Sequence, residues 1–178
     1  MLKKLGLLMF LLFIGLVSCE KNEELSVTIN PGIDTVEINT PFYDQGATCK
    51  VGSESIACEV YHNNVDTTKL GTYQIAYMAT NGEESIVAIR MVTITDETAP
   101  VVMLLPGVDT VTLEDVWVDA GVEISDNSGE ILTAVTETVG LTDSVGQFFV
   151  FYSATDSSGN VTIIIRAVNV VEGTIITS

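Results

Sequence analysis

The feature that most constrains the fold of this chain is an internal repeat with a spacing of 75 positions. The motif Pro-Gly-Ile-Asp-Thr-Val at Pro31–Val36 recurs as Pro-Gly-Val-Asp-Thr-Val at Pro106–Val111. Other residues recur at the same spacing or one position more: Asp44 and Asp119, Gly71 and Gly146, Tyr77 and Tyr152, Arg90 and Arg166. Self-similarity at a fixed spacing indicates repeated structural units. The chain is therefore expected to contain two homologous units, one after the other.

Hydrophobic residues alternate with polar residues inside each unit, as expected for β-strands that are buried on one face. The alternation is clear in three segments, Leu25–Ile29, Tyr73–Ala79 and Phe148–Tyr152. Asn81–Gly82 and Asp156–Asn160 lie between such patterns and are typical of hairpin turns. No segment after Cys19 shows helical periodicity, so each unit is expected to be a small antiparallel β-sandwich.

The joint between the two units is expected at Asp96–Pro100. Proline has no backbone N–H to donate and restricts the residue before it, so a strand should end before Pro100. Few residues separate the last strand pattern of the first unit from the first pattern of the second. The two sandwiches are therefore expected to stack end to end as a short, semi-rigid rod.

The N-terminal residues have the pattern of a secretory signal peptide, with a basic start at Met1–Lys4 and an apolar run at Leu5–Val17. As a helix this run would rise about 20 Å, less than the roughly 30 Å that a membrane span requires. Its end, Leu16–Cys19, resembles the lipobox of bacterial lipoproteins. That resemblance implies cleavage before Cys19, lipidation of Cys19, and attachment to a membrane through the N-terminal lipid.

Composition and charge exclude two classes of protein. Hydrophobic residues make up 47% of the chain, which is too many for a disordered protein. The 24 acidic and 7 basic residues give a net charge of −17, which repels phosphate groups. Nucleic acid is therefore not an expected partner.

The second unit resembles the bacterial surface immunoglobulin-like domain family. The resemblance rests on five segments: Gly107–Val111, Val118–Gly121, Asp126–Gly129, Gly146–Val161 and Arg166. The first unit is more divergent, with Asn-Gly-Glu in place of the Asp-x-x-Gly-Asn turn. The resemblance implies an all-β fold of two tandem Ig-like antiparallel β-sandwiches after a cleaved lipoprotein signal peptide, with no catalysis and no cofactor.

The expected organisation is a signal peptide at 1–18, a lipid-anchored tether at 19–24, Ig-like domains at 25–97 and 98–173, and a C-terminal tail at 174–178. The expected location is the bacterial cell envelope, on the outer membrane or cell surface. The expected function is adhesion, binding of a protein or glycan partner, or spacing of a binding face from the membrane. The alternative is a glycan-binding accessory lipoprotein of a polysaccharide-uptake system, and a hydrolase is the third possibility.

Cys49 and Cys58 are expected to form a disulfide, because an exported protein meets an environment in which disulfides persist. The corresponding positions of the second unit are Ile124 and Thr133, so the fold itself does not require the pair. Two free buried thiols are the alternative. The intervening residues 50–57 are expected to form a loop between two neighbouring strands.

Two other residue types could carry chemistry but are interpreted as structural. His62 is the only histidine and is expected to be solvated in a polar loop, without the partners of a catalytic triad. Trp117 and its counterpart Phe42 are expected to pack in the cores rather than to stack on sugars.

Repeated aspartates are expected to bond backbone donors in their own turns, at Asp34 and Asp109 and at Asp44 and Asp119. The alternative is calcium, which takes six to eight oxygen ligands. The joint is where such a site would lie. It carries Asp96 and Glu97, which Asp126 or Asp156 could approach from loops of the second unit. No recognised calcium-loop spacing is present, so the sequence by itself predicts no metal site.

Overall fold

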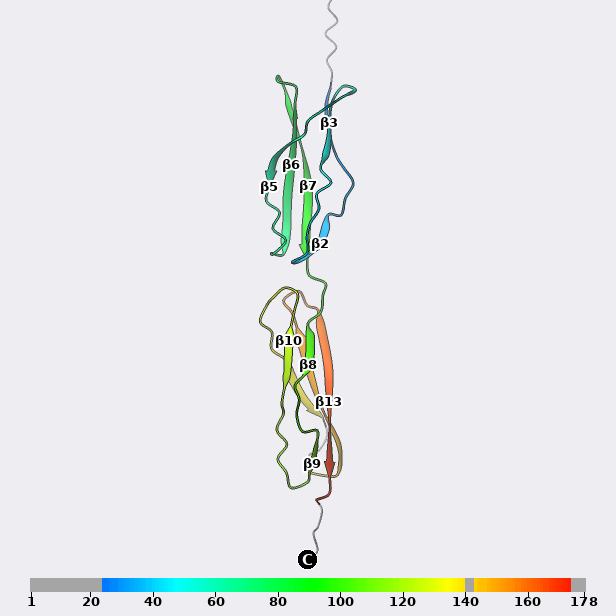
Figure 1. Ribbon diagram of the computed structural model, residues 1–178, viewed down its shortest axis with the longest axis vertical. Coiled ribbons are helices and arrows are strands. Elements are labelled where there is room, and N and C mark those ends of the chain that lie inside the picture. The colour runs from blue at the N-terminus through cyan, green and yellow to red at the C-terminus, as the bar shows by residue number, and fades with distance from the viewer. Residues whose placement is uncertain (1–23, 140–142, 174–178) are drawn as a thin grey trace, which may run out of the picture.

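The computed structural model describes residues 24–139 and 143–173, and it consists of two units arranged end to end (Figure 1). Unit one comprises the strands β1–β7 and unit two the strands β8–β13. The end-to-end arrangement confirms the predicted stacking. The predicted signal peptide and Cys19 lie outside the described residues.

All regular structure in the described residues is β-strand, as predicted. The strands of unit one are β1 (Leu25–Ile29), β2 (Thr35–Glu37), β3 (Ala47–Val51), β4 (Glu54–Ile56), β5 (Glu59–Asn63), β6 (Gly71–Thr80) and β7 (Ser85–Thr95). Those of unit two are β8 (Val101–Leu104), β9 (Thr110–Thr112), β10 (Val122–Ser125), β11 (Val135–Val139), β12 (Gly146–Thr155) and β13 (Val161–Val171). Across residues 24–139 and 143–173 there is no helix that is long and apolar enough to span a bilayer.

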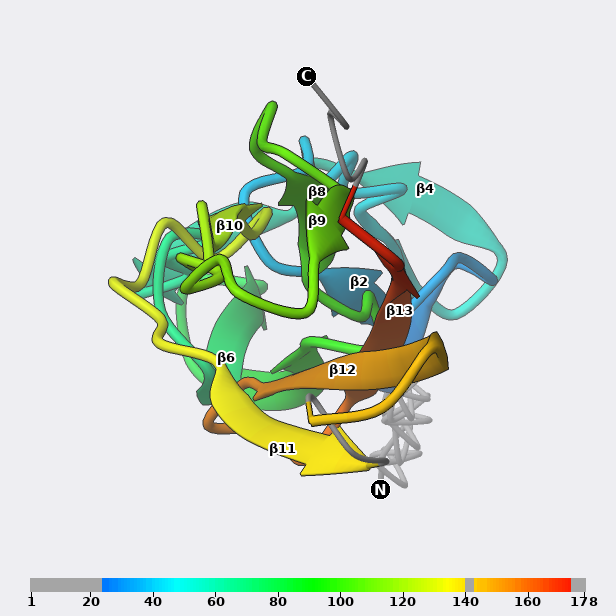
Figure 2. The same cartoon turned by 90° about the horizontal axis from the view of Figure 1, so that it is seen from below.

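Each unit is a sandwich of a small sheet and a four-stranded sheet. In unit one the small sheet has the order β1-β3-β4 and the large sheet the order β2-β7-β6-β5. In unit two the small sheet pairs β10 with β8, and the large sheet has the order β11-β12-β13-β9. In a view along the long axis, β11 and β12 lie on one side of unit two, and β8 and β10 lie on the other (Figure 2).

A long hairpin forms the centre of each large sheet. The strands β6 and β7 pair from Gly71 with Ile94 to Thr80 with Ser85, and β12 and β13 pair in the same way in unit two. The turns between them contain Asn81–Gly82 and Asp156–Asn160, which confirms both predicted hairpins. The strand next to each hairpin, β2 or β9, pairs in parallel with the last strand of its unit.

The alternating residues of these hairpins form the cores between the sheets. Buried residues cluster in unit one at Ile38, Ile75, Tyr77, Val92 and Ile94, and in unit two at Phe148, Val150, Tyr152, Val168 and Val170. Side chains of the small sheets, including Val27 and Val122, cover them from the opposite side. Burial of each large apolar side chain contributes roughly 1.5–3 kcal/mol to folding.

Trp117 and Phe42 both pack against these cores, as predicted. The Trp117 ring meets Phe148 edge to face, with the ring centroids 5.3 Å apart. Its indole Nε1 donates to the carbonyl oxygen of Val108 at 2.7 Å. Trp117 therefore reports on the core of unit two rather than offering a platform for a ligand.

Two local predictions for unit one are wrong. The segment between the cysteines is not a loop, because β3 continues to Val51 and turns through Gly52–Ser53 into β4. His62 lies in β5 rather than in a loop. Its exposure to solvent agrees with the prediction, since all five residues of β5 are exposed.

Cys49 and Cys58 form a disulfide in unit one. Cys49 is in β3 and only 1% exposed, and Cys58 follows β4, so the bond attaches the end of the β3–β4 hairpin to the small sheet. Leu25 and Ala79 pack in the same cluster as Cys49. The disulfide thus fixes the segment that leads from the small sheet into the large sheet.

Replacing both cysteines with alanine is expected to lower the free energy of unfolding of unit one by about 2–3 kcal/mol, because the disulfide closes a short loop in the unfolded chain. Urea unfolding followed by far-UV circular dichroism measures this change. Fluorescence of Trp117, the only tryptophan, should report an unchanged transition for unit two. An equal loss of stability in both units would contradict the local role of the disulfide.

Candidate functional site

The two arginines of the chain occupy equivalent buried positions, one in each sandwich. Arg90 in β7 and Arg166 in β13 are each 2% exposed. A buried guanidinium is costly unless its donors are all used. The hydrogen-bond acceptors around each guanidinium therefore show which segments of the unit the arginine connects.

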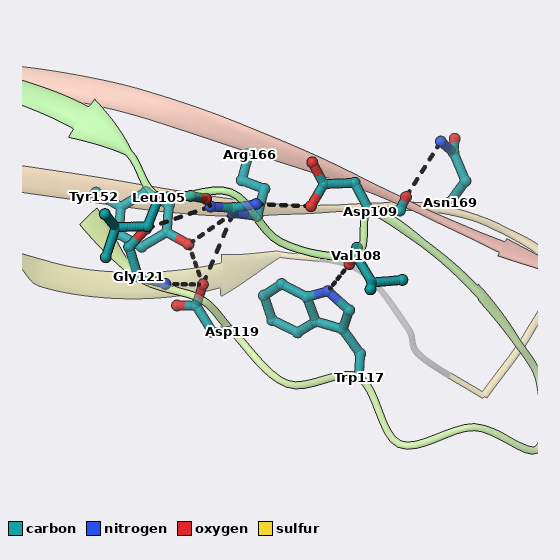
Figure 3. A network of polar contacts seen from close by, with 9 residues as sticks. All are labelled: Leu105, Val108, Asp109, Trp117, Asp119, Gly121, Tyr152, Arg166 and Asn169. Carbon is teal, nitrogen blue, oxygen red and sulfur yellow. Dashed lines mark hydrogen bonds and ion pairs between the residues drawn. The ribbon is translucent and has the colours of Figure 1, made fainter. Parts of the chain in front are cut away.

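Arg166 bonds three segments of unit two (Figure 3). Its Nη1 donates to Asp109 Oδ1 at 2.7 Å, and its Nη2 donates to the carbonyl oxygens of Leu105 and Gly121 at 2.6 and 3.3 Å. Its Nε donates to the hydroxyl of Tyr152 at 3.3 Å. The guanidinium thereby connects the large sheet to the segments that follow β8 and precede β10.

Asp119 completes this arrangement from a tight turn. Its Oδ1 accepts a hydrogen bond of 2.5 Å from the Tyr152 hydroxyl and one of 2.9 Å from the backbone N–H of Gly121. The second bond is the turn bond predicted for this aspartate. The bond with the buried tyrosine was not predicted.

Unit one contains the same network. Arg90 donates to Asp34 Oδ1 at 2.5 Å and to the carbonyl oxygen of Asn30, and the Tyr77 hydroxyl donates to Asp44. The N–H of Gly46 donates to Asp44 Oδ1 at 2.9 Å. The residues of the repeated sequence motifs therefore make closely similar contacts in both sandwiches. The exception is Arg90 Nε, which has no hydrogen-bond partner and lies 3.3 Å from Asp44 Oδ1.

The prediction that Asp34 and Asp109 bond backbone donors of their own turns is wrong. Their carboxylates instead pair with Arg90 and Arg166, which lie more than 50 residues later. The glycines of the same motifs admit the guanidinium groups. A Cβ at Gly32 would lie 2.9 Å from Arg90 Nη1, and a Cβ at Gly107 would lie 3.1 Å from Arg166 Nη1.

The tyrosine and arginine side chains of these networks have raised pKa values. Burial and the bond to Asp44 raise the pKa of Tyr77 to about 12, and burial and Asp119 likewise raise the pKa of Tyr152. Burial lowers the pKa of Arg90, but the influence of the neighbouring Asp34 and Tyr77 outweighs this effect and the pKa is raised. Phenol and guanidinium groups of this kind exchange no protons near neutral pH, so the network is structural rather than an acid–base site.

A second polar cluster lies at the joint between the units. Asp96, Asp126 and Asp156 each follow directly after a strand, β7, β10 and β12 respectively. Each can offer an oxygen such that the three oxygens lie within 4.8 Å of one another. Asp96 and Asp156 are only 8% and 6% exposed. The sequence placed Asp96 near either of the other two, and the structure brings all three together.

Glu97 is not part of this acidic cluster, contrary to the possibility considered from the sequence. Its backbone N–H instead donates to the Glu37 carboxylate at 3.0 Å. Glu37 also accepts from Thr98 Oγ1 at 2.7 Å and, across the joint, from Asn127 Nδ2 at 2.8 Å. Burial raises the pKa of Glu37, but these hydrogen bonds outweigh it and hold the pKa below its usual value.

Further hydrogen bonds join the two units. Asn39 Nδ2 of unit one donates to the Asn127 carbonyl oxygen at 2.8 Å. Asn160 Nδ2 donates to Asp156 Oδ2 at 2.8 Å and to the Asp96 carbonyl oxygen at 3.1 Å. The turn of the β12–β13 hairpin therefore closes its own hairpin and also docks against unit one.

Replacing Arg166 with methionine is expected to lower the free energy of unfolding of unit two by about 2–3 kcal/mol, because two backbone carbonyls and Asp109 lose their donor. Urea unfolding followed by Trp117 fluorescence measures the change in unit two, and far-UV circular dichroism measures both units. Lys69→Met is the matched control, since Lys69 pairs with Asp66 at the surface and is 74% exposed. The control should change stability by less than about 1 kcal/mol. Equal effects of the two variants would contradict the assigned role of Arg166.

Comparisons with known proteins identify similar structures but no family. No family model matches the chain, and no curated protein matches it. The structure is similar to the crystal structure of a lipoprotein from Bacteroides thetaiotaomicron, with 13% identity, a TM-score of 0.37, and coverage of 83% of this chain and 80% of that chain. It is also similar to the M60 catalytic domain with two CBM51 domains of ZmpB from Clostridium perfringens. That match has 12% identity, a TM-score of 0.40, and coverage of 85% of this chain and 31% of that chain.

Proposed function

We propose that this chain is a non-enzymatic bacterial surface protein, anchored by a lipid on Cys19, in which two Ig-like sandwiches present a binding face away from the membrane. The anchor is supported by the lipobox-like sequence at Leu16–Cys19. The role as a spacer is supported by the end-to-end arrangement of the units (Figure 1). Membership of the bacterial surface immunoglobulin-like family is part of the proposal and rests on the motifs of unit two.

The observation that carries the binding role is an apolar outer face on the large sheet of unit two. We define the outer face by the residues Val135, Val139, Phe149, Phe151, Ile163 and Ile165. Val135, Ile163 and Ile165 are 74%, 61% and 51% exposed. Contiguous apolar surface of this kind is uncommon on soluble proteins except where a partner binds.

Strand register brings the residues of the outer face together. Val139 pairs with Phe149, which pairs with Ala167 on β13. One row along the strands, Phe151 pairs with Ile165 on β13 and with Glu137 on β11, which places one carboxylate among the apolar side chains. Because residues paired across antiparallel strands project from the same face, these side chains form one surface rather than scattered exposed residues.

The absence of catalysis is supported by how the polar groups are used. Both buried arginines and the tyrosines beside them make structural contacts with aspartates and backbone carbonyls of their own units. His62 is exposed on β5, a strand at the edge of the large sheet of unit one. No catalytic nucleophile and base are brought together by the contacts described above.

Glycan binding is a second candidate function, and one feature of unit one favours it. A hollow of about 430 Å³ is lined by Ile33, Pro41, Phe42 and Tyr43, together with polar residues that include Thr40 and Gln45. Tyr43 is 75% exposed at this hollow. An exposed aromatic ring beside hydrogen-bonding side chains is a combination that suits a sugar ring.

The anchor is tested by mass spectrometry of the N-terminal peptide from the protein expressed in a bacterial host with lipoprotein-processing enzymes. The expected result is a peptide that begins at Cys19 and carries acyl chains. Cys49 and Cys58 provide the internal control, because both should be recovered as the disulfide and without lipid. An unmodified Cys19 still preceded by Ser18 would contradict the anchor.

The binding face is tested by photo-crosslinking on intact cells followed by identification of the crosslinked partner. Replacing Ile163 and Ile165 with lysine is expected to abolish crosslinking to that partner by placing two charges in the apolar outer face. Both positions are exposed, so the melting temperature should stay within a few degrees of that of the parent.

Val87→Lys/Ile89→Lys is the matched control for this experiment, because both residues are similarly exposed on the corresponding strand of unit one. Retained crosslinking in the unit-two variant would contradict the outer face as the binding site. If Tyr43→Ala abolishes retention on a glycan array while both lysine variants still bind, the second candidate function is favoured.

A further inference from the structure

The acidic cluster at the joint is assembled from both units of the protein. Asp96 belongs to unit one, whereas Asp126 and Asp156 belong to two different loops of unit two. Three carboxylate oxygens that can lie within 4.8 Å of one another repel each other strongly when they are removed from water. Asp96 and Asp156 are more than nine-tenths buried, so water screens this repulsion poorly.

Two oxygen atoms at the joint are buried without a hydrogen-bond donor. Asp126 Oδ2 and Asn127 Oδ1 have essentially no accessible surface and no partner. The other oxygen of Asp126 accepts from the N–H and the hydroxyl of Ser128, at 2.9 and 2.6 Å. A buried carboxylate oxygen without a donor is costly and is rare in folded proteins unless an ion or water satisfies it.

No cationic side chain among the described residues compensates the cluster. The salt bridges of residues 24–139 and 143–173 use Lys69, Arg90 and Arg166, and none of them involves a carboxylate of the joint. The electrostatics of the cluster therefore favour a bound cation.

We propose that Asp96, Asp126 and Asp156 bind a calcium ion at the joint between the two sandwiches. The ligand chemistry selects the metal. The cluster offers carboxylate oxygens, with an unpartnered amide oxygen on the neighbouring Asn127, and calcium prefers such oxygen ligands. Zinc favours histidine and cysteine, but His62 is on β5 and Cys49 and Cys58 are joined in a disulfide.

A calcium ion in this position would connect the units directly. It would add metal–ligand bonds to the existing contacts across the joint, such as those of Asn39 and Asn160. With the ion bound, the range of relative orientations of the two sandwiches is smaller than with hydrogen bonds alone. This inference concerns the joint and does not depend on the lipid anchor or on the identity of the binding partner.

The test is isothermal titration of CaCl₂ into the full chain, purified in detergent and stripped with EDTA. The expected result is one saturable site with a dissociation constant on the order of 0.1–1 mM, as in extracellular calcium modules. Saturating calcium should also raise the melting temperature by about 5 °C. Mg²⁺ should bind at least tenfold more weakly, because it requires a smaller octahedral site.

Asp126→Asn is expected to weaken calcium binding at least tenfold. Without calcium its melting temperature should equal or exceed that of the parent, since the change removes one charge from the cluster. Asp115→Asn is the matched control, because Asp115 also lies in unit two and accepts bonds within its own turn, from the N–H and hydroxyl of Thr112. This control should bind calcium as the parent does.

Small-angle X-ray scattering provides a second readout that a purely local site would not change. Calcium is expected to narrow the distribution of interatomic distances of the parent but not that of Asp126→Asn. The proposal is overturned if the parent shows no saturable calcium binding, if Mg²⁺ binds equally well, or if Asp115→Asn loses as much affinity as Asp126→Asn.

Discussion

The buried arginine of each sandwich is the interaction on which the rest of the structure depends. A small sheet of two or three short strands cannot by itself fix long connecting segments, and those segments lack a ladder of their own. Arg166 supplies donors to the segments on both sides of Val108, and Arg90 does the same in unit one. Burying a guanidinium without acceptors costs a large amount of free energy. The two sheets of each sandwich therefore pack stably only when these segments are in place. The repeated Pro-Gly-x-Asp motif provides for this contact, because its glycine leaves room for the guanidinium and its aspartate pairs with it.

The joint is held differently, by polar side chains of the two units that meet through hydrogen bonds. Glu37, Asn39, Asn127 and Asn160 form hydrogen bonds between units that are otherwise separate sandwiches. Hydrogen bonds are directional, so such a junction is specific in geometry. A strongly acidic protein with a net charge of −17 also places three carboxylates there, where repulsion is greatest. The calcium ion proposed above would offset this repulsion at the place where the two units meet.

Much of the fold could be predicted because it is encoded locally. The alternation in β6 and β12, the hairpin turns, and the position of Pro100 all involve residues close together in the chain. The proximity of Asp96 to the loops of unit two was also accessible, since Asp96 lies at the predicted joint and Asp126 and Asp156 were assigned to loops that could approach it. Local patterns, combined with the order of the two units, were sufficient for these features.

The features that could not be predicted are strands without a clear strand pattern and contacts between residues far apart in the sequence. The strand β5 is exposed at every position, and His62 was assigned to a loop because the polar residues Asn63 and Asn64 follow it. The partner of Asp34 is Arg90, and the partner of Glu37 is Asn127, 90 residues further on. A pair of arginines at corresponding places in two apolar strands was the available signal for the networks, because isolated charges in such strands must have partners.

The parallel pairing of β2 with β7 and of β9 with β13 has a mechanical consequence. In each unit a strand near the beginning of the sandwich lies beside the strand that leaves it at the other end. A pull along the long axis of the molecule loads the hydrogen bonds of these pairs in shear, so that they must break together rather than one at a time. A chain with this connectivity is suited to transmit tension between whatever holds its two ends, and forced unfolding would be governed by the height of that shear barrier.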